Sequence, residues 1–450
     1  MEKMDRTASG NMCLRREKTT YESKFGPIKA WLELCLSKSA IVSFFALTLA
    51  LGAGNALGES SSTHWIEYEP NLPVIFLDAK EQVVSDRKVR CSFQVVYPKG
   101  VPPGTTNALS GVVRIHGASS QGFAKKSFGI TLDGAVPLLG MHSSPHWVLN
   151  AAYIDRSLMR HKLSYDLFKS LSTLQNPRFA AASRFVEVQF NGSYQGAYLL
   201  MERVDRAMFG LRPYSSNEVT HSCIYKAVDH SANFGQPGHA GYEQREPDPL
   251  ARPYWQPLDR LNKMISTTPD AQFYNSTTGI VSRVDLDNAI DFHLLVLLTS
   301  NMDGITKNFI VAADAPATPA SRPRFFFAPW DYDATFGRNW DATPVSPSAW
   351  LSNHLFERLL RDEGYREKFA ARWDHLREHA FSPKTIQAMI DANVRDLGAA
   401  AERNAARWPT STGPYPDKLT FAEDIVQMKS WIERRVQWLD KEIHRQVGQK

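Results

Sequence analysis

The side chains best suited to chemistry lie in two acidic segments of the C-terminal half, residues 301–308 and 330–333. The first segment holds Asp303 and Asn308 and follows a long apolar run, and the second holds Asp331 and follows three phenylalanines. Each carboxylate therefore emerges where a buried element ends. A kinase needs such groups for phosphoryl transfer, because a carboxylate orients the attacking hydroxyl while an Asn and an Asp hold magnesium on the phosphates. The Asp303 to Asn308 spacing also matches the kinase catalytic loop, although the usual His-Arg before the Asp is missing.

A glycine- and serine-rich turn lies far upstream, at residues 117–122, and it leads to the pair Lys125 and Lys126. Backbone N–H groups of a tight turn can cradle phosphate oxygens, and a neighbouring lysine can neutralise them. By itself this pattern also fits an ordinary hairpin turn beside two solvated lysines.

Five blocks in a fixed order make the sequence similar to a known family. They are Arg114 with Gly117, Ser119 and Ser120 before Lys125-Lys126-Ser127-Phe128; Trp147-Val148-Leu149-Asn150 with Asp155, Leu158 and Arg160; Asn191-Gly192-Ser193-Tyr194-Gln195-Gly196-Ala197-Tyr198 ending in Glu202; Asn301-Met302-Asp303 with Asn308; and Pro329-Trp330-Asp331-Tyr332-Asp333 with Phe336-Gly337. In these blocks the chain resembles the CotH kinase family, the atypical protein kinases named after a bacterial spore-coat protein. Ala118 stands where the family usually has Asn, and Gly129 stands where a further basic residue is common.

The resemblance implies a kinase-like fold that binds ATP with magnesium (or manganese) between two lobes and phosphorylates Ser/Thr of an unidentified protein. It implies that Lys125 binds the ATP phosphates beneath the turn that contains Gly117 and Ser120. It makes Asp303 the catalytic carboxylate and makes Asn308 and Asp331 the metal ligands. Glu202 would lie at the link between the lobes, near the adenine.

The elements that must position these residues can be read from hydrophobic periodicity and turn residues. We expect strands at 73–77, 91–97, 111–116 and 127–132, a hairpin of 185–190 and 196–201 around Asn191-Gly192, helices at 154–171 and 286–298, an irregular insertion at 206–255, and three or four helices from 356 onward. This order predicts an α+β, two-lobed domain at 73–448, with a strand-rich N-lobe to about 205 and a helical C-lobe from about 256.

Composition and charge limit the class of protein. The 450 residues carry a net charge of +5, but residues 1–56 contribute eight Lys/Arg and five Asp/Glu, which leaves 44 against 42 beyond them. That balance gives no electrostatic case for nucleic acid. Lys38, an apolar run at 40–53 and small residues at 54–56 predict a leader and signal peptide over 1–56, followed by a linker at 57–72. We therefore expect export to the periplasm, cell surface or medium, and no stable membrane span unless the segment is uncleaved.

Several residues allow two interpretations. Cys91 and Cys223 could pair in an oxidising compartment or could be separate buried thiols. Asp155 and Arg160 fit a fold-holding ion pair better than a catalytic role. Asp333 could be a second metal ligand or could cap the following turn.

Three functions remain open. The first is an exported protein kinase. The second is an inactive, kinase-like surface, coat or adhesion protein, and nucleotide binding with magnesium would separate it from the first. The third is a metal-dependent hydrolase built on Asp303, Asp331 and Asp333, which would need further ligands.

Overall fold

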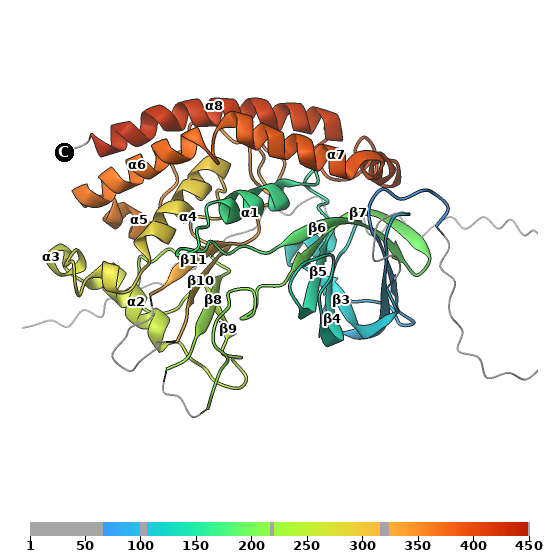
Figure 1. Cartoon of the computed structure of the whole chain (residues 1–450), viewed down its shortest axis with the longest axis horizontal. Helices are drawn as coiled ribbons and strands as arrows, with labels where there is room; N and C mark the ends of the chain where they lie inside the picture. Colours follow the sequence, from blue (N-terminus) through green and yellow to red (C-terminus); the bar gives the residue numbers. More distant parts are fainter. Residues whose placement is uncertain (1–65, 100–105, 217–219, 316–323, 449–450) are drawn as a thin grey trace, which may run out of the picture. The chain divides into compact units, whose positions relative to one another are not determined.

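The strands of the N-terminal part close into a barrel, in the order β1-β2-β3-β4-β5-β7-β6, with β1 and β6 parallel at the closure (Figure 1). Its strands are β1 Val74–Asp78, β2 Val89–Val96, β3 Leu109–His116, β4 Ser127–Val136, β5 Ser144–Asn150, β6 Ser183–Phe190 and β7 Ser193–Glu202. The computed structural model describes residues 66–99, 106–216, 220–315 and 324–448. Within these residues the first four expected strands are confirmed, whereas β5 was not expected as a strand.

Period-two burial explains the barrel. Along β2, the side chains of Val89, Cys91, Phe93 and Val95 are buried while the residues between them are exposed or half-buried. Alternation of this kind places one face of a strand in a core. The expected hairpin is also confirmed, since β6 and β7 pair antiparallel around Asn191-Gly192, which have φ of 47° and 72° as a tight hairpin turn requires.

A second sheet, in the order β11-β10-β8-β9, lies among the helices that follow. Its strands are β8 Cys223–Ala227, β9 Tyr242–Glu246, β10 Phe309–Ala313 and β11 Phe326–Pro329. The expectation of an irregular insertion at 206–255 is therefore wrong, because β8 and β9 both form there. The strand β8 is buried at four of its five positions, so it shows no alternation in sequence, and glycines, prolines and polar residues surround it.

The helices form most of the remaining chain. They are α1 Arg160–Ser170, α2 Gln256–Thr267, α3 Asp270–Phe273, α4 Leu286–Thr299, α5 His354–Leu359, α6 Glu363–Glu378, α7 Pro383–Arg407 and α8 Phe421–Val447. The expected helix at 286–298 and the C-terminal helices are confirmed. Helix α1 begins six residues later than expected, because Leu158 has a φ of 61° and Asp155 accepts a hydrogen bond from the Arg160 N–H at 2.7 Å. The result is an α+β protein with strands first and helices later.

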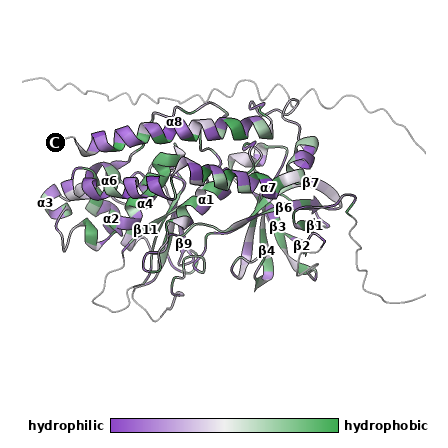
Figure 2. Cartoon of the chain, turned by 45° about the horizontal axis from the view of Figure 1, so that its top comes forward, coloured by the Kyte–Doolittle hydropathy of each residue, from purple (hydrophilic) through white to green (hydrophobic). Residues whose placement is uncertain are grey.

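Two large cores follow from this arrangement. One fills the barrel, and the other joins α1, α4 and the long C-terminal helices to one face of the second sheet. Helix α8 buries Met428, Ile432, Val436, Leu439 and Ile443, three or four residues apart, so hydrophobic and hydrophilic residues alternate along it in Figure 2.

Other expectations concern the ends and the cysteines. The leader, signal segment and most of the linker lie outside the described residues. No helix among residues 66–448, gaps excepted, is long and apolar enough to cross a membrane. Cys91 and Cys223 are free thiols buried in different sheets, so the disulfide alternative is wrong. Burial raises the pKa of Cys91 to about 11 and that of Cys223 to about 12.

A buried ion cluster ties α1 to the C-terminal helix. The Arg160 guanidinium donates to Asp155 Oδ1 at 2.6 Å and to Asp424 Oδ1 at 2.8 Å, and its Nε donates to the Thr335 carbonyl at 2.9 Å. All three charged side chains are at most 1% exposed. Burial raises the pKa of Asp424, but the opposing charge of Arg160 outweighs it and holds that pKa below its usual value. This confirms the fold-holding interpretation of Asp155 and Arg160.

Removing this guanidinium should leave two buried carboxylates without their cation. We expect Arg160→Ala to lower the free energy of unfolding by about 3–5 kcal/mol. Arg90→Ala is the control, because Arg90 and Asp133 form an exposed pair, and the loss of stability there should be much smaller. Urea denaturation measures both, and equal losses in the two variants would show that the cluster is not a major source of stability.

Candidate functional site

A cleft of about 760 Å³ lies between the barrel and the second sheet. Six of the seven residues that the sequence suggested for the site line it: Gly117, Ser120, Lys125, Asp303, Asn308 and Asp331. The fold thus gathers residues that are up to 214 positions apart, from Gly117 to Asp331, around one space.

Helix α1 holds the loop that carries Asp331. The backbone N–H of Asp331 donates to Tyr165 Oη at 3.0 Å, and the next N–H, that of Tyr332, donates to His161 Nδ1 at 3.0 Å. His161 and Tyr165 lie four residues apart on one face of α1, and both are buried. Two successive amides of the loop are thereby fixed by one helix, and the Asp331 carboxylate remains half exposed to the cleft.

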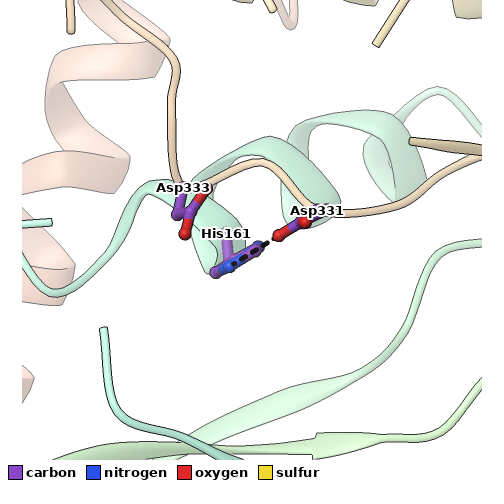
Figure 3. Close-up of side chains that lie close together, drawn as sticks. All are labelled: His161, Asp331 and Asp333. Carbon is purple, nitrogen blue, oxygen red and sulfur yellow. Dashed lines mark ion pairs between the residues drawn. The ribbon is translucent and has the colours of Figure 1, made fainter. Parts of the chain in front are cut away.

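His161, Asp331 and Asp333 form a compact cluster, in which one ligand atom of each lies within 4.8 Å of the others (Figure 3). Burial lowers the pKa of His161. Its Nδ1 accepts the Tyr332 N–H, while its Nε2 lies 3.3 Å from Asn150 Nδ2 and 3.8 Å from Asp331 Oδ1. His161 therefore holds the Asp331 loop through Nδ1, and its Nε2 faces the two carboxylates of the cluster.

The oxygens at this wall fit a divalent cation. Asp331 and Asp333 offer carboxylate oxygens, and Asn308 lines the cleft with a side-chain amide that has no hydrogen-bond partner among the described residues. Carboxylate and amide oxygens are the ligands that Mg²⁺ prefers. Asn308 and Asp331 also have φ of 58° and 60°, a left-handed backbone that concentrates at functional sites. Burial, with the nearby carboxylates of Asp331 and Asp155, raises the pKa of Asp333 well above its usual value.

The loop that carries Asp303 is held to the Asp331 loop by Asn301. The Asn301 side chain donates to the Asp331 carbonyl at 3.3 Å and accepts from the Gly304 N–H at 3.0 Å. A Cβ at Gly304 would lie 2.7 Å from Asn301 Cγ, so only glycine fits there. Asp303 itself pairs with Lys307 at 2.9 Å and faces His230 Nε2 at 3.6 Å. Asp303 is absent from the cluster of His161, Asp331 and Asp333, so the three-aspartate ligand set of a hydrolase is not assembled in the described structure.

Lys125 is buried two residues before β4 and is held by neutral groups. Its ammonium donates to the Ala197 carbonyl at 2.5 Å and to Asn404 Oδ1 at 2.9 Å, and it lies 4.5 Å from the centre of the Tyr198 ring. No carboxylate of the described residues pairs with it. Burial therefore lowers the pKa of Lys125 well below its usual value.

Helix α7 positions this lysine. Asn404 also accepts from the Ala197 N–H at 3.2 Å, and Trp408 Nε1 donates to the Gln195 carbonyl at 2.8 Å. Gly196, between them, has a φ of 97°, and a Cβ there would lie 2.5 Å from Asn404 Oδ1. The Gln195-Gly196-Ala197 stretch is therefore a docking strip for α7 as well as part of β7.

The glycine-rich turn lines the cleft, and Glu202 lies outside its lining. Residues 117–122 connect β3 to β4 and contain a short 3-10 helix, Ser119–Gly122. Gly117 has a φ of 109°, and a Cβ there would lie 2.0 Å from Ser120 Oγ. Glu202 ends β7 at the link to the second sheet, but it does not line the cleft. Its carboxylate accepts from the Ala182 N–H at 2.8 Å and contacts His142 Nδ1 at 2.6 Å.

Four residues of the site were not found from sequence: His161, Tyr165, Lys226 and Asn404. His161 and Tyr165 lie four residues apart among Leu163, Leu167 and Phe168 on the buried face of α1, and this spacing is a signal that could have indicated them. Lys226 lies on β8, inside the stretch interpreted as irregular, and Asn404 lies over 270 residues from Lys125. No local pattern indicates either of them.

The lowered pKa of Lys125 predicts a pH dependence of stability. Between the folded-state pKa and the ordinary value of 10.5, the unfolded chain binds more protons, so this lysine makes stability rise with pH. We expect wild type to gain stability relative to Lys125→Met as the pH rises from the folded-state pKa of Lys125 toward 10.5, as measured by urea denaturation. The exposed Lys80→Met is the control and should show no such trend. A constant difference between wild type and Lys125→Met would contradict the assignment.

A known family model covers the part of the chain that carries the five sequence blocks. The family model described as CotH kinase protein matches residues 113–439, which contain every residue of the site named above. The inner spore coat protein H of Bacillus subtilis (strain 168) is 32% identical over 293 residues, which cover 62% of this chain and 74% of that protein. On both grounds, the chain belongs to the CotH kinase family.

Proposed function

We propose that the protein is an ATP-dependent protein kinase with a kinase-like two-lobed fold, which transfers the γ-phosphate to Ser/Thr of another protein. One observation carries the proposal: Asp303, Asn308, Asp331 and Lys125 all line the same cleft. Membership of the CotH kinase family supports it. Export of the protein remains part of the proposal, since the leader lies outside the described residues.

The residues suggest the following division of work. Asp331 and Asn308, with Asp333 beside them, would hold Mg²⁺, which would offset the negative charge of the phosphates. His161 and Tyr165 keep the Asp331 loop fixed, so little reorganisation is needed on binding. Lys125 would neutralise phosphate oxygens from the barrel side, where its buried ammonium has no anionic partner among the described residues.

Asp303 would act on the acceptor. Its carboxylate accepts the hydrogen bond of the Ser/Thr hydroxyl and takes its proton as the oxygen bonds to the γ-phosphorus. The bond between that phosphorus and the bridging oxygen breaks, ADP leaves, and the proton passes to solvent. Lys307, at 2.9 Å from Asp303, keeps the carboxylate oriented before the acceptor arrives.

A second function rests on the relative's name. The inner spore coat protein H of Bacillus subtilis is named as a coat component, so a structural role without turnover is the alternative. The tight hold of Ala197 and Asn404 on Lys125 fits that alternative, because the ammonium is already engaged without nucleotide.

Two substitutions test the proposal. We expect Asp331→Ala to lose magnesium-dependent ATP binding and transfer together. Asp303→Ala should keep ATP binding and lose roughly 10²–10⁴ of the transfer rate, because its contribution begins in the transition state. Calorimetric titration of ATP with and without magnesium, beside transfer of radiolabel to a protein acceptor, measures both effects.

Asp133→Ala is the matched control, since Asp133 is an exposed carboxylate paired with Arg90 on the barrel. It should leave both readouts unchanged. If wild type binds no ATP with magnesium or manganese, the coat-protein alternative replaces the kinase. If Asp303→Ala transfers phosphate as fast as wild type, Asp303 is not the catalytic carboxylate.

A further inference from the structure

One end of the cleft is lined by basic residues that the proposed reaction does not use. Arg114 and His116 reach it from β3 of the barrel, and Lys226 and Arg245 reach it from β8 and β9 of the second sheet. Arg203, the first residue after β7, lies half-buried near them and is close enough to affect the charge of His116. We call these five residues the basic end of the cleft.

Few carboxylates lie close to this positive charge. Arg245 pairs with Glu243 at 2.6 Å, and the Lys226 ammonium lies 4.7 Å from the centre of the Trp330 ring. Among the described residues, the side chains of Arg114, Arg203 and Lys226 make no hydrogen bond and no ion pair within 4.0 Å. Glu243 acts on Lys226 and Arg203 from a longer distance, as Asp331 does on Lys226 and Asp205 on Arg203.

The cations act on one another across the cleft. Burial and the charges of Lys226, Arg114, Arg203 and Arg245 lower the pKa of His116 to about 4. Burial and Arg245 lower the pKa of Lys226 to about 8, although Asp331 and Glu243 oppose the shift. Residues of like charge that face each other in a partly desolvated cleft lower the stability of the folded protein, unless an ion of opposite charge binds between them.

The basic end is distinct from the Lys125 position. Lys125 is held by Ala197 and Asn404, on the side of the cleft where β7 meets α7. Lys226 belongs instead to the second sheet, where it pairs in register with Ile310 of β10, two residues after Asn308. The cleft therefore has two cationic regions, one at Lys125 beside β7 and α7 and one at Lys226 on the second sheet.

We infer that the basic end of the cleft is a second oxyanion subsite, which binds a phosphate group without a metal ion. Guanidinium groups match the oxygens of phosphate with paired hydrogen bonds, and Arg114 and Arg203 have these donors free within the described structure. The side chains of Arg114, Arg203 and Lys226 make no close ion pair among the described residues, so their combined charge favours a dianion or a longer phosphate chain over a single carboxylate. This inference does not depend on phosphoryl transfer taking place.

The experiment is calorimetric titration of the full chain with pyrophosphate at low ionic strength in EDTA. Wild type should bind, and Lys226→Gln and Arg114→Gln should each weaken binding roughly tenfold or more, as expected for loss of a charge-assisted contact. Asp331→Asn should bind at least as well as wild type. The exposed Lys80→Gln is the control for net charge and should bind like wild type. Thermal melting of each variant verifies folding, and Arg245→Gln replaces any variant that does not fold.

Two further titrations identify the source of the phosphate. If ATP in EDTA competes with pyrophosphate and adenosine does not, the subsite takes the phosphate chain of the nucleotide. If pyrophosphate still binds at saturating magnesium–ATP, the subsite takes a separate phosphate. Absence of pyrophosphate and ATP binding without metal, or binding that Lys226→Gln and Arg114→Gln leave unchanged, overturns the inference. Loss of metal-dependent ATP binding in Asp331→Ala reports on the kinase proposal alone.

Discussion

The buried contact of Arg160 with Asp155 and Asp424 is the constraint on which the rest of the site depends. It joins the first turn of α1 to α8, and through the Thr335 carbonyl it also holds the chain just after the acidic 331–333 segment. Charges removed from water are stabilising only when every partner is present, so this cluster fixes one arrangement of three distant segments. Because α1 is fixed, His161 and Tyr165 meet the Asp331 loop in one geometry.

The cleft combines two kinds of support. On the acidic side, backbone amides and carbonyls are held by side chains of neighbouring elements, as Asn301 and Tyr165 hold the Asp331 loop. On the barrel side, helix α7 reaches across to β7 and holds Lys125 through Asn404. Strained backbone at Asn308 and Asp331 is tolerated because these contacts over-determine it. The site is therefore preorganised by polar contacts between elements that are remote in sequence.

Acidic residues dominate one part of this cleft and basic residues another, although Lys307 pairs with Asp303 and Glu243 pairs with Arg245. Asp303, Asp331 and Asp333 lie beside the α4 and β11 loops, while Lys226, Arg114 and Arg245 lie where the barrel faces the second sheet. Such separation orients a ligand that carries both a metal-binding and an anionic part. Lys226 lies on β8, which is surrounded in sequence by polar residues, and it lines the cleft as the acidic residues do.

The sequence by itself determined the first four barrel strands, the hairpin at Asn191-Gly192, helix α4 and the C-terminal helices, because each follows a period or turn rule that local sequence obeys. It did not indicate β5. The ordered sequence blocks that the chain shares with the CotH kinase family also indicated Asp303, Asn308, Asp331 and Lys125 as candidate site residues. Tertiary structure decided the rest. The strand β8 forms because β9 and β10 flank it and both of its faces are covered, which removes the alternation that sequence reasoning needs. Asn404 meets Lys125, and Arg160 meets Asp424, only after the chain is folded, because contacts across more than 260 residues leave no local pattern.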